Sequence, residues 1–261
     1  DVEIYRGIVT GCNEAFIIDT PTKEKICKAD PKSEEIIKPV LRGRDIHKYY
    51  YEWAGLWIIA TFPALHLDID LYPAVKNYLS SFGKKIEQSG EKGCRKKTNN
   101  KWFETQDNIA YYNAFKENKI IWPDIALKAN FSYDEKQYYN EATSFIMTGE
   151  HLLYLLSILN SKLFDFYFNM ISPTLSNRAN RLKKVYLEQF PVPEYQNSET
   201  SMGLEKLVGE LLSLMNNRSI SDKKNASSEI TDYLNRIDSL VYKLYGLNED
   251  DIKIINKTLE Q

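Results

Sequence analysis

The amino-acid sequence predicts an α+β fold: a core with a mixed or mainly antiparallel sheet and a long central helix, followed by a C-terminal helical hairpin. Short β-prone segments separated by turn formers dominate the first 150 residues. Apolar residues at helical spacing follow, and after Pro193 two more stretches repeat that spacing. The predicted organisation is a core over residues 1–195 and a helical element over residues 196–261.

The first half of the chain predicts strands and one short helix. Residues 3–19 are expected to form a hairpin around the turn formers Thr10 to Asn13. Residues 57–62 are apolar and β-prone, and Pro63 ends the run, which suits a buried strand. A short helix is expected over residues 72–82. Further strands are expected over 119–122, 126–132 and 144–147.

A single helix is predicted from Glu150 to Met170. Its apolar residues recur at helical spacing: Leu152, Leu155, Leu156, Leu159, Leu163 and Phe166. Polar residues interrupt the run, namely Ser157, Asn160, Ser161, Lys162 and Asp165. Burying such groups in lipid costs several kcal/mol each, so this is expected to be a core helix and not a membrane span.

The C-terminal region predicts an antiparallel helix pair and a last short helix. Apolar residues recur every three or four positions over residues 204–215 and again over 230–244, with a polar linker at 216–228. Gly246 is expected to stop the second helix. Asn248, followed by three carboxylates, is expected to cap the last one.

Composition limits the classes of partner and site. The 34 basic and 36 acidic side chains give a net charge of -2, so any nucleic-acid footprint must be a local basic face. Cys12, Cys27 and Cys94 are odd in number and lack CxxC spacing, which indicates reduced thiols and no structural zinc. No secretory signal is visible, and a cytoplasmic location without a membrane partner is expected.

Most catalytic signatures are absent from the sequence. No glycine-rich phosphate loop, HExxH pair or GxSxG elbow occurs. The Asn/Asp-Pro-Pro-aromatic motif that grips the target amino group in amino methyltransferases is also missing. The chain is therefore not expected to be an enzyme by itself, and the sequence predicts no catalytic residue, metal ligand or cofactor site within it.

One nuclease-like pattern leaves an alternative open. Pro123-Asp124 precedes Asp134-Glu135-Lys136, which matches the Pro-Asp … Asp-x-Lys pattern of metal-dependent nucleases. In a chain that is 27% charged such a match arises easily, and Asp134 lies in a polar context. A solvated turn is the favoured interpretation.

The segment 84–101 is strongly basic. It carries seven lysine or arginine side chains against two glutamates, a local charge of about +5 (7 − 2). One interpretation is a mobile surface loop; the other is phosphate contact with counterion release from a duplex. The candidate DNA-contact residues are Lys84, Lys85, Arg95, Lys96, Lys97 and Lys101.

A second basic segment, residues 176–184, interleaves amides with cations. Arginine and asparagine give bidentate contacts to guanine and adenine edges in a major groove. The candidates here are Asn177, Arg178, Asn180, Arg181, Lys183 and Lys184. Arg42 and Arg44 surround a glycine in another loop, and they are either further base contacts or ion-pair partners of neighbours such as Asp45.

Several blocks, taken in order, resemble one family. They are Gly7 to Phe16 (GIVTGCNEAF), Ile37 to Ile46 (IKPVLRGRDI), Trp57 to Ile59 (WII), Lys119 to Ile125 (KIIWPDI), Leu155 to Leu163 (LLSILNSKL), Phe190 to Pro193 (FPVP) and Val241 to Leu247 (VYKLYGL). Together they are similar to the TaqI-like C-terminal specificity domain of type II, IIG-like restriction enzymes fused to adenine-N6 methyltransferases. The helix LLSILNSKL and the closing FPVP also resemble type I specificity subunits.

The resemblance implies a target-recognition domain that binds double-stranded DNA in a sequence-specific way. It implies that an N-terminal methyltransferase of the parent polypeptide uses S-adenosylmethionine, that any nuclease there uses Mg²⁺, and that both lie before Asp1. It makes the two basic segments the leading DNA contacts and demotes Pro123-Asp124 to a structural block.

Two other functions remain open at this stage. The chain could be half of a type I specificity subunit, although only one short helix pair is visible in place of long coiled-coil spacers. It could also be a protein-interaction module that docks a partner through residues 204–244.

Overall fold

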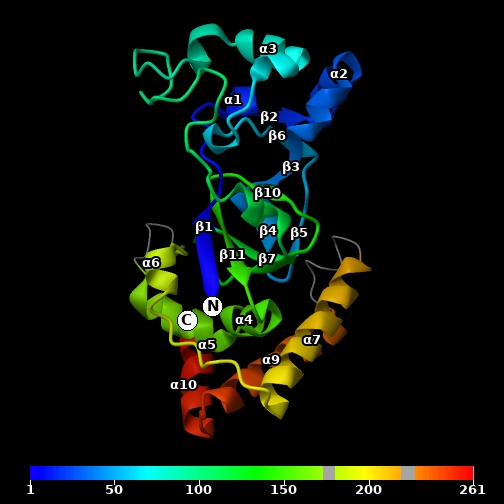
Figure 1. The fold of residues 1–261 in the computed structure, drawn as a ribbon. Helices are drawn as coiled ribbons and strands as arrows, with labels where there is room; N and C mark the ends of the chain where they lie inside the picture. The colour runs from blue at the N-terminus through cyan, green and yellow to red at the C-terminus, as the bar shows by residue number, and fades with distance from the viewer. Residues whose placement is uncertain (173–179, 219–226, 261) are drawn as a thin grey trace.

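A computed structural model describes residues 1–172, 180–218 and 227–260 (Figure 1). The α+β class and the mixed sheet character predicted above are confirmed. One sheet is wholly antiparallel, with the order β1 (Val2–Arg6), β11 (Ser144–Gly149), β7 (Lys119–Pro123) and β9 (Ser132–Asp134). The other is mixed, with the order β10 (Tyr139–Asn140), β3 (Ile37–Leu41), β6 (Leu56–Ile59) and β2 (Ile17–Asp19), because β10 runs parallel to β3.

Two short ribbons complete the described strands. One pairs β4 (Ile46–His47) with β5 (Tyr50–Tyr51), and the other pairs β8 (Ile125–Ala126) with β12 (Asn180–Arg181). The predicted strand over 126–132 is thus wrong over most of its length. In the middle of this segment the backbone is hydrogen-bonded to a side chain and not to a neighbouring strand. The Ala129 N–H donates to Asp165 Oδ1 at 2.7 Å.

The predicted hairpin over residues 3–19 is also wrong. β1 pairs with β11, β2 pairs with β6, and the short helix α1 (Asn13–Phe16) lies between them. The Thr10 hydroxyl accepts from the Cys12 N–H at 3.1 Å and donates to Asn13 Oδ1 at 2.6 Å, which starts a helical turn where a hairpin turn was expected. Both strands find partners that are distant in the sequence.

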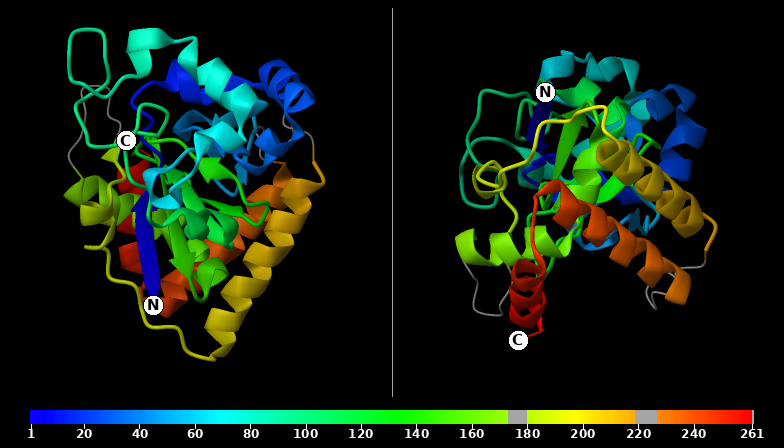
Figure 2. Two further views of the ribbon diagram at one scale, coloured as in Figure 1. Left: turned by 45° about the horizontal axis from the view of Figure 1, so that its top comes forward. Right: turned by 90° about the horizontal axis from the view of Figure 1, so that it is seen from below.

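Helices cover the two ends of the molecule (Figures 1 and 2). At one end lie α2 (Thr20–Ala29) and α3 (Pro73–Ser80), the latter as predicted. At the other end lie α4 (Leu152–Leu159), α5 (Lys162–Ile171), α7 (Glu199–Asn216), α9 (Ser228–Leu244) and α10 (Glu249–Leu259). The short α6 (Lys184–Leu187) lies beside α5.

The single central helix predicted over 150–170 is divided into α4 and α5. Asn160 leaves the helix because its side chain accepts from the Phe131 N–H at 3.1 Å and donates to the Phe131 carbonyl at 2.9 Å. Ser161 then caps α5, accepting from the Phe164 N–H at 3.1 Å. The apolar spacing continues across the break, so periodicity alone does not detect it.

Replacing Asn160 with alanine is expected to destabilise the chain by about 2–3 kcal/mol. Asn160 is 2% exposed, and its loss leaves the buried Phe131 N–H without a partner and removes one of two donors to the Phe131 carbonyl, the other being the Tyr49 N–H. Urea unfolding measures the change, and Asn99→Ala in an exposed loop position serves as the control. Equal stability of the two variants would contradict the structural role of Asn160.

The predicted C-terminal helix pair is confirmed as α7 and α9, and α10 has the predicted Asn248 cap, which accepts from the N–H groups of Asp250 and Asp251. The buried faces of these helices join one apolar cluster with α4, α5 and β7, so packing is continuous across residue 195. Of the described helices, none has both the length and the apolar character required to cross a bilayer.

Candidate nucleic-acid interface

A hollow of about 670 Å³ lies between the turn that follows β3, helix α1 and the turn that follows β7. Four potentially cationic side chains line it: Arg6, Arg42, Arg44 and His47. Its other polar side chains are those of Asn13, Asp124, Asn130, Glu141 and Thr143. The hollow therefore presents arginines on a wall built from segments that are distant in the sequence.

A second hollow of about 340 Å³ adjoins the first. Arg6 and Asp124 line both hollows, and the second adds Arg181, Lys183 and Lys184. The structure thus brings the predicted Arg42–Arg44 loop and the described part of the second basic segment onto one connected surface. We call this surface the basic face, defined by Arg6, Arg42, Arg44, Arg181, Lys183 and Lys184.

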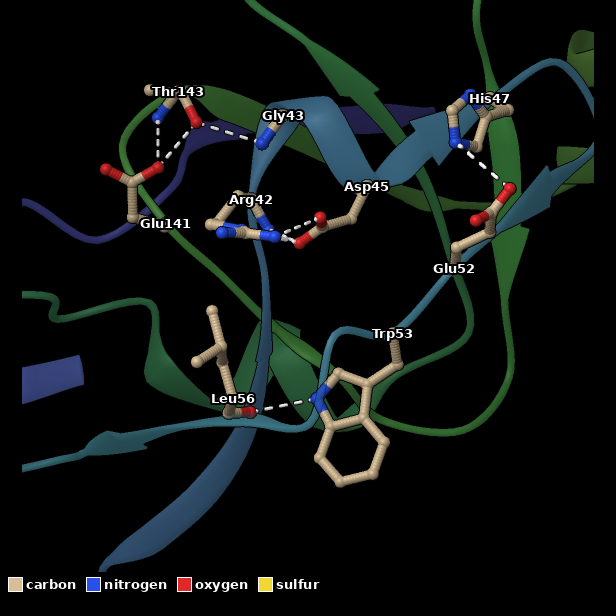
Figure 3. A network of polar contacts seen from close by, with 9 residues as sticks. All are labelled: Arg42, Gly43, Asp45, His47, Glu52, Trp53, Leu56, Glu141 and Thr143. Carbon is tan, nitrogen blue, oxygen red and sulfur yellow. Dashed lines mark hydrogen bonds and ion pairs between the residues drawn. The ribbon is translucent and has the colours of Figure 1, made fainter. Parts of the chain in front are cut away.

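Arg42 is held in place by Asp45, as one of the two sequence interpretations expected (Figure 3). Its Nε and Nη2 donate to the two Asp45 carboxylate oxygens at 3.0 and 2.7 Å. The hydrogen bond to Asp45 raises the pKa of Arg42, which stays a cation. Because this guanidinium is already paired, Arg42 shapes the wall of the hollow more than it offers free donors.

A polar network fixes the loop beside Arg42 (Figure 3). The Gly43 N–H donates to Thr143 Oγ1 at 2.9 Å, and Thr143 in turn donates to the buried Glu141 carboxylate. A Cβ on Gly43 would lie 2.4 Å from the Thr143 carbonyl oxygen. Glycine is therefore required for the close approach of these two backbones.

The segment Gly7 to Phe16, the first block that resembles the family, contacts the same Glu141. Asn13 Nδ2 donates to Glu141 Oε1 at 3.1 Å, which orients the amide on the wall of the hollow. A Cβ on Gly7 would lie 2.1 Å from the Glu141 carbonyl oxygen, so only glycine fits there as well. Gly7 and Asn13 thus fix the position of Glu141 beside the residues that define the basic face.

Arg44 and Lys183 are the cations that remain available. Arg44 is exposed, and within the described ranges neither side chain forms an ion pair. Arg181 is half-buried and also lacks an ion pair among residues 1–172, 180–218 and 227–260. Lys184 lies 3.7 Å from Glu188, an exposed pair of small energetic value.

Arg95 is misassigned by the sequence interpretation. It is 3% exposed, and its guanidinium donates to the backbone carbonyls of Thr10, Ile86, Trp102 and Glu104 at 2.6 to 2.9 Å. A phosphate cannot reach it. Arg95 instead anchors the basic segment to the start of the chain.

The other candidate contacts of segment 84–101 are exposed: Lys84, Lys85, Lys96, Lys97 and Lys101. Lys85 pairs with Glu14 at 2.9 Å. The segment extends on the same side of the molecule as α6 in Figure 1 and in the left view of Figure 2. These lysines remain candidate phosphate contacts. Asn177 and Arg178 lie outside the described residues, and for Asn180 only its place in β12 is described.

The nuclease-like pattern does not assemble. Asp134 is opposite Lys119, and Asp124 follows the end of β7, five positions after Lys119, which at about 3.3 Å per residue separates the two backbone positions along the strand by roughly 16 Å. Asp134 is also fully buried against Lys119, so the predicted solvated turn is wrong as well. Within the described part of the chain, no group of three or more potential ligands could hold a metal ion.

Sequence reasoning missed three residues of the site: Arg6, Asn13 and Glu141. Arg6 ends β1, and its Nε donates to the Ala142 carbonyl at 3.2 Å. Lone polar residues next to strands carry no pattern of their own. For Asn13 a signal existed, because it belongs to the block Gly7 to Phe16 that resembles the family.

Comparison with known proteins agrees with this fold. The chain is 24% identical over 262 aligned residues to the type II methyltransferase M.BstVI of Geobacillus stearothermophilus, covering 99% of this chain and 41% of that protein. A structure of the type IIL restriction-modification enzyme MmeI in complex with DNA superposes with a TM-score of 0.68 at 14% identity, covering 99% of this chain and 35% of MmeI.

The type IIG restriction endonuclease BpuSI superposes with a TM-score of 0.52 at 15% identity, covering 93% of this chain and 30% of BpuSI. The chain spans less than half the length of each of these relatives. Residues 38–192, more than half of the chain, match the sequence model of the TaqI-like C-terminal specificity domain. The chain therefore belongs to the TaqI-like C-terminal specificity domain family.

Proposed function

We propose that this chain is the target-recognition domain of a restriction-modification enzyme and binds double-stranded DNA through the basic face. Membership of a specificity-domain family implies DNA target recognition in general. The observation that carries the specific proposal is the convergence of two distant loops on hollows that share Arg6 and Asp124. Convergent unpaired cations on one surface are the footprint expected for a polyanion.

In the proposed mechanism one set of side chains contacts the phosphates and another set contacts the base edges. The exposed lysines of segment 84–101, with Lys183 and Lys184, contact phosphates and fix the register of the duplex. Arg44 and Arg181 reach base edges in the major groove, with Asn177, Arg178 and Asn180 as further candidates. Arg42, already paired with Asp45, keeps the loop in shape for Arg44.

The consequence of such binding is the placement of a target adenine. A methyltransferase must extrude its target base from the duplex, so a recognition domain that fixes the register decides which base is extruded. In the proposed parent polypeptide this catalytic part lies N-terminal to the chain and uses S-adenosylmethionine. A nuclease in the parent protein would use Mg²⁺.

The helix pair offers less support for a protein-docking function. The apolar faces of α7 and α9 are buried against α4 and against each other, including Leu204, Val208 and Ile237. These faces are therefore used within the chain itself.

Replacing Arg44, Arg181 and Lys183 with alanine together is expected to weaken binding to a random duplex roughly tenfold or more at moderate salt. Each lost phosphate contact reduces the slope of log K against log salt by about 0.9, and Lys183 is the residue of the three assigned to a phosphate, so the slope should fall by about 0.9. Fluorescence-anisotropy titrations at several salt concentrations measure both quantities.

A matched control replaces three exposed lysines of the C-terminal helices, Lys206, Lys243 and Lys257, with alanine. It removes the same charge and should leave affinity and slope within about twofold of the parent chain. If the two triple variants weaken binding equally, net charge and not the basic face governs binding. If the parent chain binds no duplex even at low salt, the proposed function of the isolated chain is wrong.

A further inference from the structure

The ribbon formed by β8 and β12 stands where the two hollows of the basic face meet. Arg181 pairs directly with Ile125, and Asp124 immediately precedes the ribbon. The Asp124 N–H donates to the Thr143 carbonyl at 2.8 Å, and the Leu182 N–H donates to the Asp124 carbonyl at 2.8 Å. The backbone of Asp124 is thus held from both sides, and its side chain forms part of the wall shared by both hollows.

The Asp124 carboxylate has acceptor capacity that the described part of the chain does not use. Its Oδ1 is buried and has no hydrogen-bond partner there. Arg6, Arg181 and Lys183 line the same hollow, yet none of them forms an ion pair with Asp124 among the described residues. A carboxylate oxygen buried without a donor is costly. Because the Asp124 side chain is half-buried and lines both hollows, a rotation about its side-chain bonds would turn a carboxylate oxygen toward a donor that enters them.

We infer that Asp124 is a specificity-determining residue that accepts a hydrogen bond from the N4 amino group of a cytosine in the major groove. This inference rests on the proposed function, since it requires the basic face to contact DNA. A two-stranded ribbon is one of the elements that a major groove admits. The β8–β12 ribbon would therefore carry Asp124 and Arg181 toward the base edges together.

The chemistry of the base edges selects cytosine. A carboxylate only accepts, and guanine presents two acceptors in the major groove while thymine presents an acceptor and a methyl group. Adenine presents an amino donor, but its N7 acceptor lies beside it and would face the carboxylate. Cytosine presents its amino donor alone, and the guanine paired with it offers O6 and N7 to an arginine such as Arg181.

The test is a selection of duplexes from a library with a randomised central segment, using the 261-residue chain. Sequencing compares the parent chain with Asp124→Asn, Asp124→Ala and the control Asp232→Asn, which changes an exposed carboxylate of α9. The parent chain should enrich a motif with one C·G pair read by Asp124. Asp124→Asn should lose at least about fivefold of the preference for cytosine at that pair and gain preference for adenine, because a carboxamide matches adenine N6 and N7.

Asp124→Ala should accept any base at that pair, and Asp232→Asn should select the parent motif. Affinity for random duplexes should stay within about threefold of the parent chain for all variants, because Asp124 makes no phosphate contact. Thermal unfolding midpoints of the Asp124 variants should be no lower than that of the parent chain, since the backbone hydrogen bonds of Asp124 survive substitution and the carboxylate without a donor is removed.

Different results overturn the inference at different levels. An unchanged motif for Asp124→Asn removes Asp124 as a reading residue and leaves DNA contact by the basic face intact. Salt-dependent DNA binding by the parent chain without any enriched motif would likewise remove Asp124 as a reading residue and leave DNA contact by the basic face intact. Failure of the parent chain to bind any duplex at low salt overturns the proposed function and this inference together.

Discussion

Replacing Asp134 with alanine is expected to destabilise the folded chain by about 3–5 kcal/mol, because it leaves the buried Lys119 ammonium without its counter-ion. Both side chains are fully buried, and Lys119 Nζ lies 2.6 Å from Asp134 Oδ2. Asp134 also accepts from the Lys136 and Tyr138 N–H groups at 2.8 and 2.9 Å. The pair ties the edge strand β9 and the following turn to β7.

The pH dependence of the Asp134→Ala variant has a definite sign. Burial lowers the pKa of Lys119, and Asp134 opposes that shift, so the variant lowers the pKa further. Between this folded-state pKa and the value of an unfolded lysine, the unfolded chain binds more protons, and stability therefore rises with pH. The loss caused by Asp134→Ala should be smaller at pH 9 than at pH 6.

Urea unfolding of a double-mutant cycle checks this prediction. The changes in the free energy of unfolding caused by Lys119→Met and Asp134→Leu should be strongly non-additive. The double variant should lose less stability than the sum of the two single losses. The exposed pair Lys184 and Glu188 is the control and should contribute less than about 0.5 kcal/mol. An additive cycle would mean that the two buried charges do not depend on each other.

Replacing Arg95 with methionine is expected to cost about 3–4 kcal/mol and to loosen residues 84–101. The substitution keeps much of the apolar volume, but it removes the donors for carbonyl groups of Thr10, Ile86, Trp102 and Glu104. Burial lowers the pKa of Arg95 to about 10, which leaves it protonated at neutral pH. The variant should unfold at lower urea concentration and exchange the amide hydrogens of this segment faster.

Lys96→Met and Lys97→Met are the matched controls, because both lysines are exposed neighbours of Arg95. They should change stability by less than about 0.5 kcal/mol. If they contact phosphates, each should reduce the salt slope of DNA binding by about 0.9. Should Arg95→Met prove as stable as these controls, the five hydrogen bonds of Arg95 do not anchor the segment.

Much of the fold follows from local patterns. Leu204, Val208 and Leu211 recur on one face of α7 and are buried as their spacing predicts. Gly246 has a positive φ of 67° just after α9, as a helix-stopping glycine should. Such features depend on residues a few positions apart, so the sequence contains the information required to predict them.

Features that depend on distant partners were predicted less well. The α4–α5 break requires Phe131 to meet Asn160, and the absence of an N-terminal hairpin requires β11 and β6 to pair with β1 and β2. Arg95 and Arg44 are both arginines in basic, loop-like segments, yet one is buried and the other exposed. Residue type and local context do not distinguish those two environments.

The sequence by itself determined the α+β class, the C-terminal helix pair and, through ordered short blocks, membership of a specificity-domain family. Only the tertiary structure decided which cations share a surface, because Arg6, Arg44 and Lys183 come together through long-range strand pairing and loop packing. It also decided that Arg95 and Asp134 are interior residues. The physical reason is that burial and ion pairing arise from contacts between segments far apart in the chain, which local periodicity and composition do not encode.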